Sequence, residues 1–582
     1  MARLVAVAVA AVAVAASGCG ASTEPPPHRP PPTAAPGART ITIVGTNDLH
    51  GAIDRLPILA GYLDILRAAR AADGGALVPI DAGDMFQGTL ASNLDEGKTV
   101  VAAYGAMGYA AAAIGNHEFD FGPVGPAVTA ATPAEDPRGA LLARAAEASF
   151  PLLTANILDA ESGERIVWPR MPPSTVIDAA GVSVGIIGVT TEATPFTTMP
   201  ANFVGLTMLE PALAVVAEAR RLRAAGAALI VVAAHVGSKC SDLHDPSDLS
   251  SCDQDEELFT MAAAIPPGTV DVIVAGHTHA AMAHRIHDIA VIESYASGRA
   301  FGRVDVRVSA RGVVTAVNIS QPRDLCPLGD DGAPVPVAAC GGQTYEGQPV
   351  VANAAVQALV DETLAAAKAR ADERLGPTVT APITRAYGEE SALGNLFTDL
   401  MLAAQPSADV ALTNGGGLRA DIPAGPLTYD GLYQANPFDN RFALVALRGR
   451  HLRRLVSNNL GRDGGIFSLA GVTVAARCEG ARLVVDLTRK GKLVGDDDAL
   501  TLVTSDFLAS GGDGVIGRLK LPDGAVTVTD EIIRESMATQ LRGVKQLDPA
   551  VLLDRKAPRL RYPGARPVRC GDAGPSTPAE PD

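Results

Sequence analysis

The chain has 582 residues, which is too long for one hydrophobic core, so we expect two domains. Hydrophobic residues make up 47% of the chain and charged residues 19%, a composition that excludes a largely disordered protein. The formal net charge of −16 argues against a partner that is a nucleic-acid polymer. An anionic substrate would therefore need a local positive site.

The first residues have the pattern of an export signal. Arg3 precedes an Ala/Val run that reaches Ala16, and small residues then lead to Cys19. The run is too short and too rich in Ala for a convincing membrane-spanning helix. Residues 1–19 resemble a lipoprotein-type signal, in which Cys19 becomes the lipidated N-terminus and the sole contact with a membrane. The alternative is ordinary cleavage to a soluble secreted form, and either reading places the protein in the cell envelope, the periplasm or outside the cell.

Both ends of the chain are rich in Pro. Residues 20–39 contain two Pro-Pro-Pro runs, which predict an extended tether that cannot pack a core. Residues 563–582 have a similar composition, and we expect a disordered tail there.

Six cysteines follow Cys19, and an even number in an exported chain suggests disulfides. Pairing of nearest neighbours predicts Cys240–Cys252, Cys326–Cys340 and Cys478–Cys570. A metal site built from cysteines is the poorer alternative, because the chain has no Cys-x-x-Cys motif.

The first half of the chain predicts an α/β domain. Five apolar runs have the length and composition of buried strands, and helical stretches such as residues 211–225 lie between some of them. The runs cover residues 40–45, 76–80, 109–114, 229–234 and 270–275.

Each of these five runs is followed by Asp, Asn or His, often beside a Gly. In α/β sheets, functional groups gather at the carboxyl ends of the strands, so we expect these side chains to converge. The candidates are Asp48, His50, Asp84, Asn116, His235, His277 and His279. Oxygen and nitrogen ligands without thiolates suit two divalent metal ions, with one carboxylate bridging them. Outside this setting, His244, His284 and His287 are predicted to be surface residues.

The second half begins with a predicted helix over residues 350–374, which we interpret as a connector. Beyond it, the Asn414-Gly-Gly-Gly turn lets the backbone approach a ligand closely. Arg419 offers a planar fork suited to phosphate. Phe438 and Phe507 lie beside turns in a chain with few aromatic residues, and packing in the core is the alternative to a binding role.

Several of these motifs together resemble the metallophosphoesterase signature. The matching stretches are Asn47-Asp-Leu-His-Gly, Gly83-Asp84, Gly115-Asn-His-Glu, His235 and Gly276-His-Thr-His. With Phe119-Asp120 after the third stretch, the sequence resembles the 5′-nucleotidase family over roughly residues 40–560. The resemblance implies an α/β/β/α sandwich over residues 40–345, a helical connector over 346–375 and an α/β substrate-binding domain over 376–562.

The resemblance also implies roles for the candidate residues. The counterparts of Asp48, His50, Asp84 and His279 bind one metal ion in that family. The counterparts of Asp84, Asn116, His235 and His277 bind the other, so that Asp84 bridges. Zn, Mn or Co are the expected ions. The counterparts of His117 and Asp120 form a dyad beside the leaving oxygen.

For the substrate, the resemblance implies a nucleobase clamped by Phe438 and Phe507, with Asn414 on the base, Arg419 on the phosphate and Asp513 on the ribose. The family usually has Arg at the position of Tyr387, and Arg385 is the candidate substitute. The implied reaction is release of phosphate from nucleoside 5′-monophosphates by a metal-activated water. Hydrolysis of a UDP-sugar or a cyclic nucleotide on the same scaffold, or a non-catalytic envelope binding lipoprotein, are the alternatives. The sequence leaves the oligomeric state open.

Overall fold

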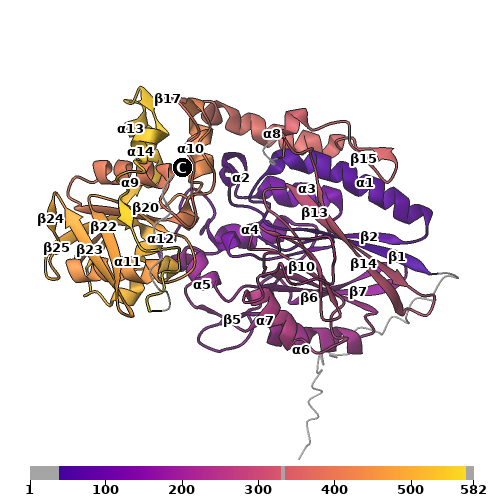
Figure 1. Ribbon diagram of the computed structural model, residues 1–582. Helices are drawn as coiled ribbons and strands as arrows, with labels where there is room; N and C mark the ends of the chain where they lie inside the picture. Colours follow the sequence, from indigo (N-terminus) through magenta and orange to yellow (C-terminus); the bar gives the residue numbers. More distant parts are fainter. Residues whose placement is uncertain (1–37, 330–333, 572–582) are drawn as a thin grey trace, which may run out of the picture.

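The computed structural model of the protein describes residues 38–329 and 334–571 (Figure 1). The predicted export signal, with Cys19, and nearly all of the predicted tether lie outside these residues. Figure 1 shows two domains side by side, one formed by the indigo-to-magenta half of the chain and one by the orange-to-yellow half. None of the helices in the described ranges has both the length and the apolarity to cross a membrane.

The first domain contains two six-stranded sheets, in the orders β14-β13-β1-β2-β3-β4 and β11-β12-β10-β9-β7-β6. Their central strands run parallel, and antiparallel pairs lie toward the edges. The first sheet comprises β1 (Arg39–Thr46), β2 (Ala76–Asp81), β3 (Ala111–Ala113), β4 (Leu152–Leu153), β13 (Ala300–Val308) and β14 (Val314–Asp324). The second comprises β6 (Ser174–Ala179), β7 (Val182–Thr190), β9 (Leu229–His235), β10 (Val272–Ala275), β11 (Ala281–Ile286) and β12 (Ile289–Ser294). The five predicted strands are all present.

The two sheets pack face to face, and helices cover their outer faces, as in the predicted α/β/β/α sandwich (Figure 1). Alternation along β1 explains the layering: Ile41 and Ile43 face the second sheet, whereas Val44 faces the helices. The helices over the first sheet include α1 (Leu56–Ala72), α2 (Leu90–Leu94), α3 (Lys98–Met107) and α4 (Gly139–Glu147). Those over the second are α6 (Pro211–Ala224) and α7 (Glu257–Ala264). The short helix α5 (Thr194–Thr197) lies at the boundary with the second domain.

The predicted connector helix is shorter than expected. Helix α8 runs over Ala354–Ala371, and strand β17 (Arg374–Val379) begins where the prediction still had helix. The side chain of Asn353 caps the helix, accepting from the backbone N–H of Ala355 at 3.0 Å and Val356 at 3.2 Å. The helix packs against α1, α2 and α3 of the first domain and against α10 (Tyr429–Ala435) of the second. It is therefore part of the packed structure of both domains.

The second domain is built on a five-stranded sheet, β21-β18-β25-β20-β26, with helices on both faces. Its strands are β18 (Val410–Asn414), β20 (Arg441–Arg448), β21 (Phe467–Ala470), β25 (Ala499–Ser505) and β26 (Val526–Ile532). Smaller sheets contain β17, β19 (Gly425–Thr428) and β27 (Gln546–Leu547), and β22 (Thr473–Glu479), β23 (Arg482–Arg489), β24 (Lys492–Leu493) and β28 (Leu560–Arg561). The helices are α9 (Ala392–Ala404), α10 (Tyr429–Ala435), α11 (Gly449–Leu460), α12 (Asp506–Ala509), α13 (Ile533–Leu541) and α14 (Pro549–Leu552).

All three predicted disulfides are present, and each closes within one domain. Cys240–Cys252 and Cys326–Cys340 lie in the first domain, and Cys478–Cys570 lies in the second. The last bond corrects the predicted boundary of the disordered tail at residue 563, because Val568 is buried and Cys570 is cross-linked within the second domain. The rest of the predicted tail, residues 572–582, lies outside the described residues.

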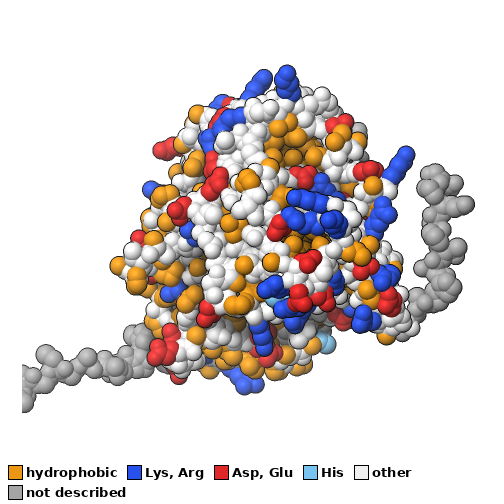
Figure 2. Space-filling model, turned by 90° about the vertical axis from the view of Figure 1, so that its left-hand side faces the viewer, with side chains coloured by type: hydrophobic (Ala, Val, Ile, Leu, Met, Phe, Trp, Pro, Cys, Tyr) orange, Lys and Arg blue, Asp and Glu red, His pale blue; other side chains and the backbone are white. Residues whose placement is uncertain are grey.

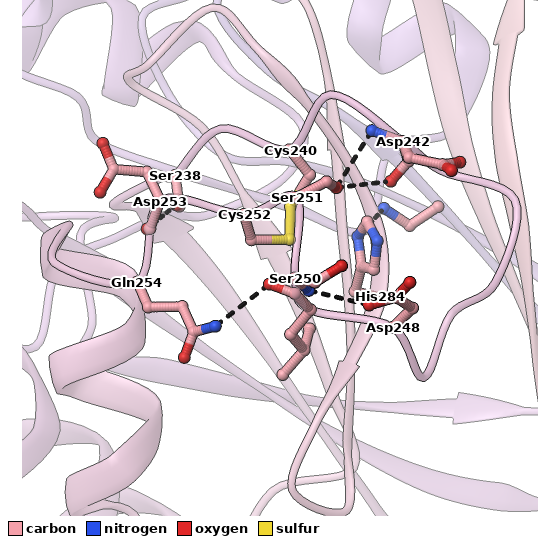
Figure 3. The surroundings of a disulfide bond; sticks show 12 residues. Ser238, Cys240, Asp242, Asp248, Ser250, Ser251, Cys252, Asp253, Gln254 and His284 are labelled. Atoms are coloured by element: carbon pink, nitrogen blue, oxygen red, sulfur yellow. Dashed lines mark hydrogen bonds between the residues drawn. A yellow bond between two sulfur atoms is a disulfide. The ribbon is translucent and has the colours of Figure 1, made fainter.

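The prediction that His284 is a surface residue is wrong. The loop over residues 240–252, closed by the Cys240–Cys252 disulfide, lies across β11 and covers this side chain (Figure 3). The backbone N–H of Arg285 donates to Pro246 O at 2.7 Å, which holds the loop on the strand. The ring of His284 lies near both sulfur atoms, but these are bonded to each other and offer no thiolate to a metal ion. His244 and His287 are exposed, as predicted.

The end of the molecule formed by the second domain faces the viewer in Figure 2, where Lys and Arg side chains lie beside Asp and Glu side chains. Within this domain, ion pairs join Arg450 to Asp497 and Arg453 to Asp496. Charges of both signs are therefore interspersed on the second domain.

Candidate active site between the domains

The strand ends of both sheets meet at one edge of the sandwich. Asp48 and His50 follow β1, and Asp84 follows β2. These two loops are tied together, because Asp48 N donates to Gly83 O and His50 N donates to Asp84 O, both at 2.9 Å. A Cβ on Gly115, after β3, would lie only 2.1 Å from Oδ1 of Asp84, so only Gly fits there.

The seven candidate metal ligands lie together in two neighbouring groups. In the first, Nε2 of His279 lies 3.4 Å from Oδ1 of Asp48 and 2.9 Å from Nε2 of His50. In the second, Nε2 of His235 lies 3.1 Å from Oδ2 of Asp84, 3.0 Å from Oδ1 of Asn116 and 3.2 Å from Nδ1 of His277. Oδ2 of Asp84 is also 3.9 Å from Nε2 of His50, so Asp84 lies between the groups.

The donor atoms are oriented as metal ligands need to be. Nδ1 of His50 lies 2.8 Å from Gln87 O, and Nδ1 of His235 lies 2.9 Å from Ala82 O. A carbonyl can only accept, so each ring carries its proton on Nδ1 and turns the lone pair of Nε2 into the site. Oδ1 of Asp48 is buried and has no hydrogen-bond partner among the described residues. The residues present therefore suit divalent metal ions.

The electrostatics of the site favour a bound cation. Burial would raise the pKa of Asp84, but His235 and His117 hold it well below its ordinary value. Burial, with nearby His235, lowers the pKa of His277 to about 3, so this ring is neutral. Burial also opposes a charge on His235, yet Asp84 beside it raises the pKa of His235 to about 10. Ionised carboxylates among imidazoles thus attract positive charge, and metal binding would displace the proton held there.

Most of the candidate ligands have an uncommon backbone conformation. Five of them lie in the left-handed region: Asp48 (φ 49°), His50 (φ 48°), Asp84 (φ 56°), His277 (φ 81°) and His279 (φ 57°). For a residue other than Gly this conformation is costly and tends to occur at functional sites. The surrounding loops therefore hold these side chains in place at a conformational cost.

His117 and Asp120 form the predicted dyad. Nδ1 of His117 lies 2.5 Å from Oδ2 of Asp120, and the other carboxylate oxygen accepts from Oγ1 of Thr198 at 3.0 Å. Burial would lower the pKa of His117, but Asp120 and Asp84 outweigh burial and raise it above its ordinary value. The ring lies between the two halves of the site, with centroid distances of 5.4 Å to His50 and 5.7 Å to Phe438.

A cavity of about 550 Å³ opens between the domains beside these groups. From the first domain it is lined by Asp84, Asn116, His117, Asp120, His277 and His279, among others. All six predicted substrate residues line it from the second domain: Arg385, Asn414, Arg419, Phe438, Phe507 and Asp513. Asp48, His50 and His235 lie behind this surface, buried.

Arg419 makes the most direct link across the cavity, with Nη2 at 3.2 Å from Nε2 of His50. Nδ2 of Asn414 donates to Oδ2 of Asp513 at 2.8 Å, so these two polar side chains form one unit. Arg385 is exposed, and its Nη1 donates to Leu418 O at 3.2 Å. Tyr387, at the position where the family has Arg, also lines the cavity.

Sequence reasoning missed the residues that support the site. The buried carboxylate of Glu118 accepts from the backbone N–H of Asp84 at 2.9 Å, Met85 at 2.7 Å and Gly115 at 2.7 Å. It thereby joins the loops after β2 and β3. The only signal was its place directly after His117 in the third motif.

Sequence reasoning also assigned no role in the site to Asn47 or Lys239. Nδ2 of Asn47 donates to Oδ2 of Asp48 and to Tyr295 O, both at 2.7 Å, which orients the Asp48 carboxylate. Lys239 lines the cavity and pairs with Glu256 at 3.2 Å.

The chain is similar to known proteins over most of its length. Residues 367–518 match the family described as 5′-nucleotidase, C-terminal domain. The chain is 26% identical over 510 residues to Protein UshA of Yersinia enterocolitica, a match that covers 81% of this chain and 86% of the relative. It is 24% identical over 517 residues to a 5′-nucleotidase of Vibrio cholerae, covering 81% and 85%.

Over most of its length the chain is therefore similar to 5′-nucleotidases. Among solved structures, a 5′-nucleotidase precursor from Thermus thermophilus shares the fold, with a TM-score of 0.68 and 24% identity over 90% of this chain and 99% of that one. The stretch that matches the 5′-nucleotidase C-terminal domain contains all the substrate candidates that line the cavity. The metal-ligand candidates all lie in the preceding domain.

Proposed function

We propose that the protein is a metal-dependent phosphohydrolase that releases phosphate from nucleoside 5′-monophosphates. One observation carries the proposal: a single cavity brings the cluster of Asp, Asn and His donors from one domain against Phe438, Phe507 and Arg419 from the other. The cluster supplies a site for phosphate chemistry, and the aromatic side chains supply a surface on which a base can stack.

For the metal site, we infer two divalent ions of the Zn, Mn or Co type. Asp48, His50 and His279 would hold one, Asn116, His235 and His277 the other, and Asp84 both. When bound, such ions supply Lewis acidity, which favours ionisation of an attacking water and neutralises charge on phosphoryl oxygens.

The protein side chains would bind and orient the substrate. Phe438 and Phe507 would hold the base, while the amide of Asn414 and the carboxylate of Asp513 would form hydrogen bonds with the nucleoside. Arg419 would pair with the phosphoryl oxygens, with Arg385 in support, because a guanidinium fork matches phosphate geometry.

His117 would deliver a proton to the ester oxygen that leaves phosphorus. Its Nδ1 is engaged by Asp120, so Nε2 is the nitrogen available for this transfer. Asp120 keeps the ring in a fixed orientation and favours its protonated form.

The cellular setting is also proposed. The N-terminal export pattern and the three disulfides support an exported protein, because disulfides persist in oxidising compartments. We propose that it acts in the cell envelope or periplasm, attached to the membrane through a lipidated Cys19.

The substrate assignment is tested by comparing two esters. Stacking of a base on an aromatic ring is worth about 1–3 kcal/mol, or roughly 5- to 150-fold in binding. Phe438→Ala and Phe507→Ala should lower kcat/KM for AMP by such factors and leave kcat/KM for a small aryl phosphate nearly unchanged. Equal losses on both esters would assign the two Phe residues to packing and would remove the support for a nucleotide substrate. UDP-glucose and a 2′,3′-cyclic nucleotide in the same assay would report the alternative substrates.

The metal assignment is tested by Asp84→Ala. Because Asp84 lies between the two donor groups, its loss should empty both metal positions and abolish activity. Elemental analysis of the purified variant measures this, with His117→Ala as the matched control that keeps its metals. Two ions per chain in Asp84→Ala would refute the bridging role.

A further inference from the structure

The loop over residues 436–440, which we call the base loop, follows α10 and carries Phe438. Two of its carbonyl groups share one donor: Nη1 of Arg534 lies 3.2 Å from Asn436 O and 3.0 Å from Phe438 O. The other terminal nitrogen of Arg534 pairs with the carboxylate of Asp439. One guanidinium thus binds two backbone carbonyls and one side-chain carboxylate of the loop.

The side chain of Arg534 is itself fixed. It is 3% exposed and comes from the first turn of α13, in the second domain. Its guanidinium carbon lies 4.0 Å from the centroid of the Tyr433 ring, and Nε donates to the hydroxyl of Tyr429 at 3.3 Å. Both tyrosines belong to α10, the helix that leads into the base loop. Arg534 therefore joins the base loop to two helices of its own domain.

The base loop meets the first domain on its other side. Pro437 O, between the two carbonyls held by Arg534, accepts from Nδ2 of Asn93 at 3.2 Å and from Nε2 of Gln87 at 2.8 Å. Gln87 also accepts, through its backbone oxygen, from Nδ1 of the metal-ligand candidate His50. The path of the loop thus decides where Phe438 stands relative to the metal site.

We propose that Arg534 is a positioning residue for base recognition, which sets the path of the base loop and thereby the placement of Phe438 against the nucleobase. Arg534 does not line the cavity and acts only through the loop. A lysine could not replace it, because a single ammonium lacks the planar fork that reaches two carbonyls and a carboxylate at once. The inference rests on the proposed nucleotide substrate.

The test compares Arg534→Lys with the wild type on AMP and on a small aryl phosphate. We expect KM for AMP to rise and kcat/KM for AMP to fall, by no more than the roughly 5- to 150-fold expected for losing the stacked ring. For the aryl ester, kcat/KM should stay within about twofold, because that ester has no base to stack. Equal losses on both esters, or no loss on AMP, would overturn the proposal.

A double-mutant cycle measures the coupling between Arg534 and Phe438, which a general structural role of Arg534 would not produce. If Arg534 acts through Phe438, then Arg534→Lys should cause no further loss on AMP once Phe438→Ala is present. Full additivity of the two losses would show that Arg534 acts by another route and would overturn the proposal.

Two further variants serve as a control and as a second test of the proposal. Arg542→Lys, at the end of the same helix and paired with Glu373 on the surface, is the matched control and should leave both esters unchanged. Tyr433→Leu removes the ring beneath the guanidinium while leaving Arg534 in place, and it should weaken AMP selectively if Arg534→Lys fails to fold. No selective loss in Tyr433→Leu would then overturn the proposal.

The outcomes separate this inference from the proposed function. If the wild type hydrolyses the aryl ester but Phe438→Ala does not affect AMP, the proposed nucleotide function fails. If Phe438→Ala weakens AMP selectively and Arg534→Lys does not, only the role of Arg534 fails.

Discussion

Asp84 engages both halves of the site with one carboxylate. Oδ1 accepts from the backbone N–H of His117 at 2.9 Å, whereas Oδ2 faces Nε2 of His235 at 3.1 Å and Nε2 of His50 at 3.9 Å. Its backbone N–H is held in turn by Glu118. This one side chain therefore links the metal donors to the backbone beneath His117, and its position depends on a buried neighbour.

The dyad leads to a prediction about pH. Asp120 raises the pKa of His117, and a proton donor works only while it is protonated. Asp120→Asn removes that effect and lowers the pKa of His117. As pH rises, the variant should therefore lose activity at a lower pH than the wild type does. We expect the alkaline limb of the kcat/KM profile to shift toward lower pH.

The measurement is the profile with a small aryl phosphate, which does not depend on base binding. Thr198→Val is the control: it removes a hydrogen bond to Asp120 but keeps the carboxylate, so its alkaline limb should stay in place. An unmoved limb in Asp120→Asn would show that His117 is not the proton donor.

At the scale of the elements, the strands and their polar ends could be predicted, because they depend on local pattern. The apolar runs of β2 and β9 are continuous, and each strand ends in the Asp or His that follows its run. Glu118 could not be predicted, since its partners are backbone N–H groups of two separate loops. Arg534 serves a loop that lies far away along the chain, and nothing in the sequence near either one indicates the contact.

The burial of His284 under the loop over β11 is another feature that the local sequence pattern did not indicate, and it leads to a prediction. His284 is buried only because the disulfide-closed loop crosses the strand (Figure 3). Removing a disulfide that closes a loop of this length typically costs about 2–4 kcal/mol. The double variant Cys240→Ser, Cys252→Ser should lose stability by about that amount and should expose His284.

Chemical denaturation followed by circular dichroism measures the loss of stability, and modification of His284 by diethylpyrocarbonate, read by mass spectrometry, measures its exposure. The control replaces Cys326 and Cys340 in the same way, because their bond closes a loop of similar length but does not cover His284. Equal protection of His284 in both variants would contradict the role given to the loop.

For the whole molecule, the cavity exists only where the two domains meet, yet each disulfide closes within one domain. Arg419 reaches His50, and the base loop reaches Gln87, across a boundary that no one of the three disulfides spans. The net charge of −16 is offset locally by Arg385 and Arg419 at the cavity. The proposed phosphate recognition thus depends on contact between the two domains.

The packing of helix α8 indicates where the chain can be cut to give a stable fragment that contains the first domain. Val356 and Val360 are buried against the helices of that domain, and each such side chain contributes about 1.5–3 kcal/mol when fully buried. A chain of residues 38–371 should therefore fold and bind metal, whereas residues 38–345 should expose an apolar face and aggregate.

Size-exclusion chromatography and elemental analysis of the two fragments test this, with the full chain as the reference. The longer fragment should lose the preference for AMP over an aryl phosphate, because it lacks the base loop. A soluble, metal-loaded fragment of residues 38–345 would show that α8 is dispensable to the first domain.

The disulfide pattern has a consequence for how the protein matures. Each bond joins a cysteine to the next one along the described chain, so that the six pair in strict succession. A chain that crosses a membrane with its N-terminus leading presents them in that order, and each partner emerges before any competitor. Correct pairing can then follow from the direction of transport, so that an oxidant alone should suffice and an isomerase to reshuffle wrong bonds should not be needed.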